Sequence, residues 1–263
     1  MNISNKKTPF QREWDNLCRK EQHFFNNRIN KKESKLNNML ADKIPEKLQN
    51  TLDTAFEKAF AVIFDKGSGI IEKTFSKDKI SLNYKVNMYT DKIAGSHKTL
   101  HAFTKQAVEK GNVNLAISGI SGIGMGLFGI GIPDIPVFIG MIIKNLYEIS
   151  LSYGIDYNFA EEKYFMLLII KGAVSYGDNL IQTNRKIEKF IRENRLPENY
   201  SFSEQVSETS SMLSKELLYM KFLQGIPIIG VVGGTYDLIC MKQITEYAKL
   251  KYQKRFLLDY KNK

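Results

Sequence analysis

Residues 111–143 read GNVNLAISGISGIGMGLFGIGIPDIPVFIGMII, and this stretch decides the fold of the chain. Its 33 residues carry one charge, Asp134, which lies between Pro133 and Pro136, and they hold eight of the 18 glycines in the chain. A run this apolar is typical of a segment buried in a core or in lipid. The two prolines predict a turn between two helical arms. We therefore expect an all-α, multi-helix bundle with a central apolar, glycine-rich helical hairpin.

Helical spacing of apolar residues continues on both sides of this hairpin, and we find no run of alternating strand residues. From Pro45 to Ile63 the apolar residues form one buried stripe, which we expect Gly67 to end. Further helices are expected over residues 68–75, 91–110, 137–152, 159–173, 178–195, 201–223 and 236–260. The chain is predicted to have two parts, a basic N-terminal arm or helix over residues 1–43 and a helical domain over residues 44–263.

Short polar residues predict where two of these helices begin. Asp91 is expected to cap the helix that reaches Lys110, and this places Ile93 on its buried side. Ser201 and Glu204 have the spacing of a capping box, in which each side chain bonds the backbone of the other. Both patterns predict helix starts in the parts of the chain that flank the hairpin.

Two further caps are expected inside the apolar centre. Asp134 is predicted to cap the helix that follows Pro136. Tyr153-Gly154 is predicted to end that helix, with Gly154 in a left-handed conformation, and Asp156 to cap the next one. Asp134 and Asp156 also define an alternative, a carboxylate-dependent hydrolase, but no motif brings them together. We expect structural roles for both and favour a protein that is not an enzyme.

The charge of the chain is strongly positive, with 38 Lys and Arg against 28 Asp and Glu. Residues 111–182 carry only three of these basic groups and six of the acidic ones, so the excess lies in the flanks. Basic flanks around an apolar centre suit an anionic membrane surface. Nucleic acid is the other usual partner, but we find no zinc spacing or RNA-binding signature and do not favour it. A merely solvated, lysine-rich surface is the third interpretation.

A series of motifs occurs in order along the chain: Gly126-Leu127-Phe128-Gly129-Ile130-Gly131-Ile132-Pro133-Asp134-Ile135-Pro136, Tyr153-Gly154-Ile155-Asp156, Glu161 or Glu162 with Phe165-Met166-Leu167, Gly225-Ile226-Pro227-Ile228-Ile229-Gly230 and Tyr252-Gln253-Lys254-Arg255-Phe256-Leu257. Together they resemble the EcsC family over about residues 45–258. The resemblance implies a bacterial protein, named after one encoded beside an ABC exporter, and it supplies no catalytic residues or cofactor. It implies a cytoplasmic location, peripheral at the inner face of the cell membrane, with an ABC transporter as a candidate partner.

The candidate membrane, partner or ligand segment comprises Gly122, Gly126, Phe128, Gly129, Pro133, Asp134, Pro136, Tyr153, Gly154, Asp156, Gly225, Pro227 and Gly230. A straight helix over residues 111–133 would be about 35 Å long, enough for a span. Its glycines and polar residues argue against one. A hairpin that enters lipid part way and a buried soluble hairpin both stay open. A further alternative is a pocket behind the two Gly-Ile-Pro segments that binds a lipid-like or other apolar small ligand.

Two other patterns in the sequence have the spacing of known metal or cofactor sites. His97 and His101 lie four residues apart on one face of a predicted helix, a spacing that binds zinc in some proteins. The glutamate of the HExxH motif is missing, so they are weak metal candidates and a surface pair is favoured. Residues 124–129 match the glycine pattern of dinucleotide-binding loops, but Pro133 and Pro136 would break the helix that such a loop needs. We expect no cofactor.

Overall fold

The computed structural model describes residues 6–29, 44–111, 134–223 and 235–262. These residues form helices and turns and include no strand, so the predicted all-α bundle is confirmed. The glycine-rich arm of the predicted hairpin, residues 112–133, lies outside the described residues. The helices are α1 (Pro9–Ile29), α3 (Glu46–Val62), α4 (Ser68–Glu72), α5 (Lys77–Ala94), α6 (His97–Gly111), α8 (Asp134–Ser152), α9 (Ala160–Ala173), α10 (Gly177–Glu193), α11 (Phe202–Leu223) and α12 (Thr235–Lys261).

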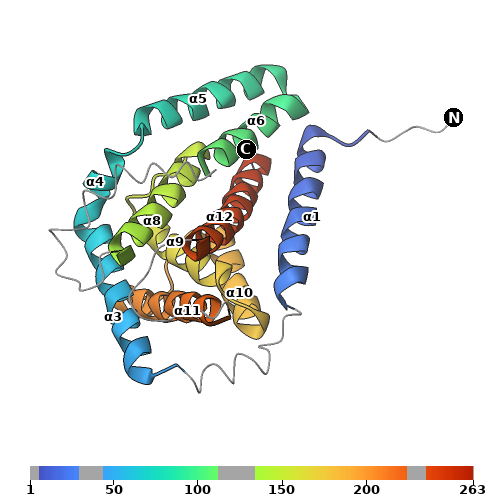
Figure 1. Ribbon diagram of the computed structural model, residues 1–263. Helices are drawn as coiled ribbons and strands as arrows, with labels where there is room; N and C mark the ends of the chain where they lie inside the picture. The colour runs from blue at the N-terminus through green and yellow to red at the C-terminus, as the bar shows by residue number, and fades with distance from the viewer. Residues whose placement is uncertain (1–5, 30–43, 112–133, 224–234, 263) are drawn as a thin grey trace.

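The core lies around α8, α9 and α12. Figure 1 shows α9 and α12 in the middle of the molecule, with the other helices around them. Every side chain from Tyr164 to Ile170 in α9 is buried, because α10, α11 and α12 all pack against this helix. The C-terminal arm of the predicted hairpin, Ile135 to Ile143, is part of α8, and its largest side chains are buried in the same core.

The N-terminal part of the chain contains α1, which packs on α12, α6 and α10. Lys251 of α12 is fully buried and forms ion pairs with Glu21 of α1 and Glu188 of α10. Arg28 at the end of α1 donates hydrogen bonds to the backbone oxygens of Ala173 and Ser175. The basic N-terminal element therefore makes buried polar contacts with the bundle.

Two predicted helix boundaries were wrong. Gly67 does not end the first helix, because α3 continues through a π-helical turn (Ile63–Gly67) directly into α4. Both Phe64 and Gly67 in this turn are buried, and tertiary packing outweighs the weak helix propensity of glycine. The start of the helix predicted at Asp91 was also misplaced.

Asp91 lies in the last turn of α5, which ends at Gly95 in a left-handed conformation (φ 51°). Its carboxylate accepts hydrogen bonds from Thr99 Oγ1 (2.6 Å) and Tyr260 Oη (2.8 Å) instead of capping a helix. The next helix, α6, begins at His97, and Ser96 Oγ accepts a hydrogen bond from the Thr99 backbone N–H. The serine that directly follows Gly95 therefore does the capping that the sequence pattern assigned to Asp91.

Candidate functional site

Four apolar side chains on α5 face solvent. Leu82, Val86, Tyr89 and Ile93 are 60%, 53%, 69% and 69% exposed. Their spacing of four, three and four residues places them in one stripe along the helix. Ile93, which the sequence pattern placed on a buried face, belongs to this stripe, so that prediction was wrong.

The opposite side of α5 makes the contacts with the bundle. Ile80 is buried, and Tyr84 and Met88 pack against the core. The helix is therefore apolar on two opposite faces, of which only one is covered. Figure 1 shows α5 along the outer edge of the molecule. A helix in this position needs only one apolar face for folding, so the second face has no role in the core.

Lysines lie beside the exposed stripe. Lys79, Lys85 and Lys92 are exposed, and on the helix Lys85 and Lys92 are one heptad apart along the same side of the stripe. We call these lysines and the stripe residues the α5 outer face. Apolar side chains with a tyrosine among them and long cationic side chains along the edge are the pattern of helices that lie in a membrane interface.

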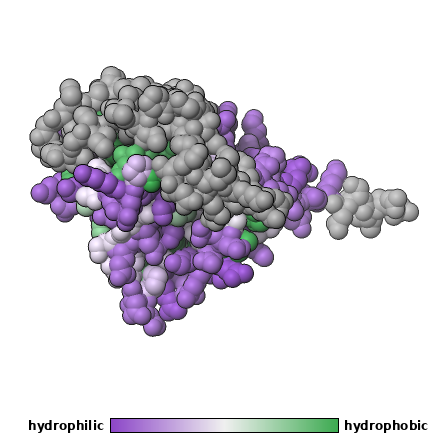
Figure 2. Space-filling view, turned by 60° about the horizontal axis from the view of Figure 1, so that its bottom comes forward, coloured by the Kyte–Doolittle hydropathy of each residue, from purple (hydrophilic) through white to green (hydrophobic). Residues whose placement is uncertain are grey.

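The side of the molecule seen in Figure 2, which brings the lower part of Figure 1 forward, is mostly hydrophilic over the described residues.

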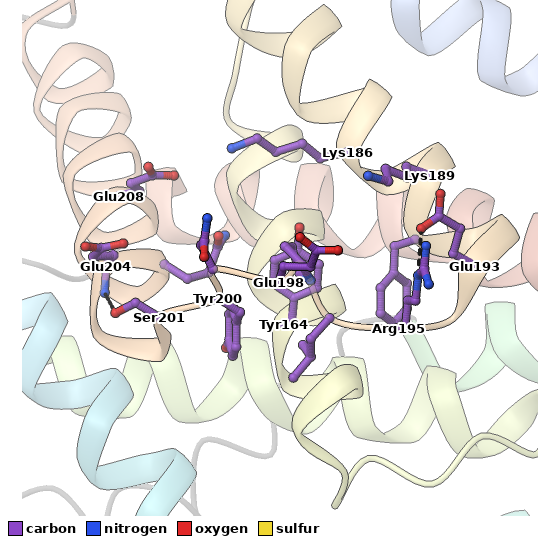
Figure 3. A pocket seen from close by; sticks show the side chains of 15 residues that line it. Tyr164, Lys186, Lys189, Glu193, Arg195, Glu198, Tyr200, Ser201, Glu204 and Glu208 are labelled. Atoms are coloured by element: carbon purple, nitrogen blue, oxygen red, sulfur yellow. Dashed lines mark hydrogen bonds and ion pairs between the residues drawn. The ribbon is translucent and has the colours of Figure 1, made fainter.

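A second feature is a cavity of about 600 Å³ between α9, α10 and α11. This volume is within the range of small-molecule sites. Figure 3 shows Lys186 and Lys189 of α10 along one edge, and Glu204 and Glu208 of α11 at the left of the view. The lining residues are Tyr164, Lys186, Lys189, Phe190, Glu193, Arg195, Leu196, Pro197, Glu198, Asn199, Tyr200, Ser201, Glu204, Gln205 and Glu208.

One wall of this cavity is aromatic and carries buried polar atoms. The Tyr164 ring lies 5.6 Å from the Phe190 ring and 5.2 Å from the Tyr200 ring, between centroids. Gln205 is 7% exposed, and neither its Nε2 nor the Tyr200 hydroxyl has a hydrogen-bond partner among the described residues. A buried polar group left this way costs about 1–3 kcal/mol. Burial, with the nearby Tyr164, raises the pKa of Tyr200 to about 12, so its hydroxyl is a neutral donor at pH 7.

The charges around the cavity are only partly paired. Arg195 Nε lies 3.1 Å from Glu193 Oε2, and Lys171 Nζ lies 2.6 Å from Glu208 Oε2. The Lys171 hydrogen bond lowers the pKa of Glu208, and the charge of Lys186 adds to this effect. Four other lining side chains have no hydrogen bond or ion pair with a described residue; they are Lys186, Lys189, Glu198 and Glu204.

The predicted histidine pair shares a carboxylate. His97 Nε2 and His101 Nδ1 lie 3.0 Å and 2.8 Å from the same oxygen of Glu13, which is 1% exposed and comes from α1. Thr104 and Gln253 donate to the other oxygen of Glu13. The expected shared face is confirmed. Over residues 6–29, 44–111, 134–223 and 235–262, no group of three His, Cys, Asp or Glu side chains is placed to hold a metal ion.

The predicted segment residues are placed only in part. Asp134 is the first residue of α8, and its side chain, with the capping predicted for it, lies outside the described residues. Pro136 is buried in the first turn of α8. Gly154 has the predicted left-handed conformation (φ 75°), and Tyr153 beside it is buried. Those outside the described residues are Gly122, Gly126, Phe128, Gly129, Pro133, Gly225, Pro227 and Gly230.

The capping role predicted for Asp156 was wrong. Its carboxylate accepts hydrogen bonds from the backbone N–H (3.0 Å) and side-chain amide (2.8 Å) of Asn158, in a tight local turn. Helix α9 begins two residues after Asn158, and Phe159 before it makes no side-chain cap. An aspartate side chain accepts a hydrogen bond from the backbone N–H two residues later as readily as it caps a helix. Sequence spacing does not distinguish these two roles. Glu162 of the same motif is buried and pairs with Arg255.

One described helix passes a length and hydropathy test for a membrane span. It covers Ile135–Ser152 in α8, and 83% of it is buried inside the bundle. A core helix of a globular protein has the same composition, so α8 is explained by its packing.

The α5 outer face was missed from the sequence. The helix predicted from Asp91 leaves out residues 77–90, so it does not bring Leu82, Val86 and Tyr89 onto a common helical face. The available signal was a pair of apolar stripes on opposite sides of one helix. The apolar directions of two opposite stripes nearly cancel around the helix axis, so the sequence shows no single apolar face that would identify the helix as amphipathic.

Comparisons with known proteins agree on one family. The EcsC protein family matches residues 11–257 of the chain. Protein EcsC of Bacillus subtilis (strain 168) is 25% identical over 219 residues, which cover 83% of this chain and 83% of that protein. No solved structure matches significantly. The family match begins at residue 11 and therefore includes most of α1, which the motifs over residues 45–258 do not cover.

Proposed function

The chain belongs to the EcsC protein family, and we propose that it is a non-enzymatic accessory protein that docks on an anionic membrane surface through the α5 outer face. The observation that carries the proposal is the stripe formed by Leu82, Val86, Tyr89 and Ile93, which is more than half exposed. Scattered single apolar residues on a surface need no explanation, but four in register along one helix form a continuous contact area. A membrane interface covers such an area without a protein partner.

Charge supports the choice of an anionic surface. Lys79, Lys85 and Lys92 are exposed beside the stripe, and each lysine near an anionic bilayer contributes about 1 kcal/mol. Tyr89 has an apolar ring with a polar tip, which suits the level of the lipid headgroups. Insertion of the stripe into the membrane interface would be favoured by a free energy of about 25 cal/mol for each Å² of apolar surface that it buries. The lysine stems can lie along the same surface while their ammonium groups stay in water.

Two finer elements of the proposal rest on the sequence. Residues 112–133, which lie outside the described residues, supply a second apolar segment that enters the membrane. An ABC exporter in the same membrane is the protein partner that the family resemblance implies. On this proposal the protein is peripheral and acts from the cytoplasmic face.

Flotation with liposomes tests the proposal. The full chain should float with vesicles that contain 30% phosphatidylglycerol and stay behind with pure phosphatidylcholine. Leu82→Asn combined with Ile93→Asn should abolish flotation, because polar groups interrupt the stripe at both ends. Ile239→Asn is the matched control, since Ile239 is an exposed apolar residue on α12. A folded double variant that floats as well as the unchanged chain would refute docking through α5, and loss only on deleting residues 115–132 would assign it to the glycine-rich segment.

A further inference from the structure

Helix α1 lies on the outside of the bundle, as Figure 1 shows, and it buries little apolar surface. Its buried residues are Glu13, Leu17 and Arg28, and only Leu17 among them is apolar. The aromatic side chains of α1 are only partly buried. Because apolar burial contributes so little here, the polar contacts of α1 decide how firmly the helix docks.

One of these contacts joins the buried carboxylate of Glu13 to two histidines. His97 Nε2 and His101 Nδ1 of α6 lie 3.0 Å and 2.8 Å from the same carboxylate oxygen, while Thr104 and Gln253 donate hydrogen bonds to the other oxygen. No lysine or arginine of the described residues lies within 4 Å of this carboxylate. The two imidazole rings are therefore the groups that can balance its charge.

The surroundings of the cluster supply no competing charge. Tyr153, in the turn after α8, lies near Glu13, and burial raises the pKa of its hydroxyl, an effect to which the charge of Glu13 adds. This hydroxyl therefore stays neutral. The neighbouring charged side chains of α1, α6 and α12 are exposed or paired elsewhere; they are Arg12, Lys98, Lys105, Lys254 and Arg255.

Protons can reach both histidine rings from solvent, because their side chains are 41% and 43% exposed. Histidine is the side chain that ordinarily changes its charge between pH 5 and pH 8. A neutral ring can donate one N–H to the carboxylate, and a protonated ring forms a charge-assisted hydrogen bond that is about twice as strong. The ring centroids of His97 and His101 lie 5.8 Å apart, so two protonated rings would repel each other. One proton therefore balances the single charge of Glu13.

We propose that Glu13, His97 and His101 form a pH-sensitive latch, which holds α1 on α6 and α12 more firmly when one of the two rings carries a proton. The added attraction is present on the acid side of the range in which histidine titrates and is lost as the pH rises through that range. The other ion pairs of α1 join Glu21 to Lys251 and Lys254. Lysine and glutamate side chains normally keep their charges between pH 6 and pH 8, so these pairs add nothing to the response.

Hydrogen–deuterium exchange of the full chain, in the absence of membranes, tests the proposal. The amides of α1 should exchange about fivefold more slowly at pH 6 than at pH 8, after correction for the effect of pH on a free amide, because a neutral hydrogen bond becomes a charged one. Helix α3, which lies away from α1 in Figure 1, is the internal reference and should show no such difference. The test does not depend on docking through α5.

Variants assign the response to these residues. His97→Gln combined with His101→Gln keeps neutral hydrogen-bond donors and should remove the difference between the two pH values. Glu13→Gln, which keeps the size of the side chain without its charge, should remove it as well. His23→Gln is the matched control, because His23 is the third histidine of the chain and its ring contacts Asn27 on α1 instead.

Three results would overturn the proposal. The first is exchange of α1 that is equal at pH 6 and pH 8. The second is a slowing of α3 as large as that of α1, because the pH would then act on the whole bundle. The third is a pH response that survives in the double histidine variant or in Glu13→Gln, or that disappears in His23→Gln.

Discussion

The ring of Tyr84 lies directly against the α-carbon of Gly154. A Cβ atom at Gly154 would lie 2.8 Å from Tyr84 Cε2 and closer still to two other ring atoms. Gly154 also has φ 75°, in the left-handed region that only glycine adopts at low cost. This contact joins α5 to the turn that follows α8, and it requires glycine for two separate reasons.

Gly154→Ala should therefore be strongly destabilising. The left-handed backbone costs a residue with a Cβ about 1–2 kcal/mol, and displacement of the Tyr84 ring adds about 1–3 kcal/mol. Gly95→Ala is the matched control, because Gly95 is also left-handed (φ 51°) but a Cβ there meets nothing within 4 Å. Urea denaturation should show the larger loss for Gly154→Ala. Equal losses would mean that Tyr84 moves aside freely and that only the backbone matters.

This contact also shows what the sequence could and could not predict. The left-handed Gly154 was predicted, because a helix that ends at Tyr-Gly is a local pattern. Its partner Tyr84 was not, because a contact between residues 70 positions apart leaves no trace in local spacing. The same division holds for the buried helices. Those with one clear apolar stripe, such as α3, were found, whereas α5, with apolar residues on both sides, was not.

The candidate sites follow the same rule. His97 and His101 were placed correctly on one face, but their partner Glu13 lies on a helix for which no such contact was expected. The cavity between α9, α10 and α11 depends on residues from three helices, and none of its unpaired groups belongs to a recognisable motif. Local patterns therefore predicted helices and turns, and the sites depend on which helices pack together.

Arg255→Met should be destabilising, because it leaves the buried carboxylate of Glu162 without its cationic partner. Glu162 is buried, and burial raises its pKa, while the charge of Arg255 and the hydrogen bond from Tyr252 work against this rise. Arg255 Nη1 lies 2.6 Å from Glu162 Oε2. Removal of one partner of such a buried pair costs about 3–5 kcal/mol. Thermal and urea unfolding measure the loss.

Replacement of both partners provides the control for this pair. Glu162→Leu combined with Arg255→Met should recover much of the stability that Arg255→Met loses, since apolar residues of similar volume often replace a buried ion pair at little cost. A double variant as unstable as the sum of the two single variants would show that Glu162 and Arg255 contribute independently, which would contradict the explanation by an isolated buried charge.

Glu188→Gln should weaken the dependence of stability on acid pH. Burial alone would raise the pKa of Glu188, but Lys251 and Lys254 outweigh it, and the pKa is lowered from its ordinary value of 4.5. The native state therefore binds this proton less tightly than the unfolded state does. The stability that the charge contributes is present above pH 4.5 and is lost as the pH falls through the lowered pKa.

Urea unfolding between about pH 6 and pH 3 measures this dependence. The variant should be less stable than the unchanged chain at neutral pH and should lose less stability on acidification. Lys251 keeps Glu21 as a partner, so the variant should still fold. Glu109→Gln, on the exposed surface of α6, is the control and should leave the acid dependence as it is. Parallel pH profiles for the Glu188 variant and the unchanged chain would contradict the assignment.

Neutralising the lysines beside the α5 stripe should weaken membrane binding without abolishing it. Lys85→Gln and Lys92→Gln each remove one charge near the surface, which corresponds to about a fivefold loss of partitioning into anionic vesicles for each lysine. The apolar stripe remains, so residual binding should depend less on salt than binding of the unchanged chain, which should weaken as salt rises and screens the lysines. Lys215→Gln, on α11, is the control: it has the same net charge as each single α5 variant, and it should bind vesicles as the unchanged chain does. If that control loses as much binding as Lys85→Gln, the attraction comes from the net charge of the whole molecule and α5 has no special part in it.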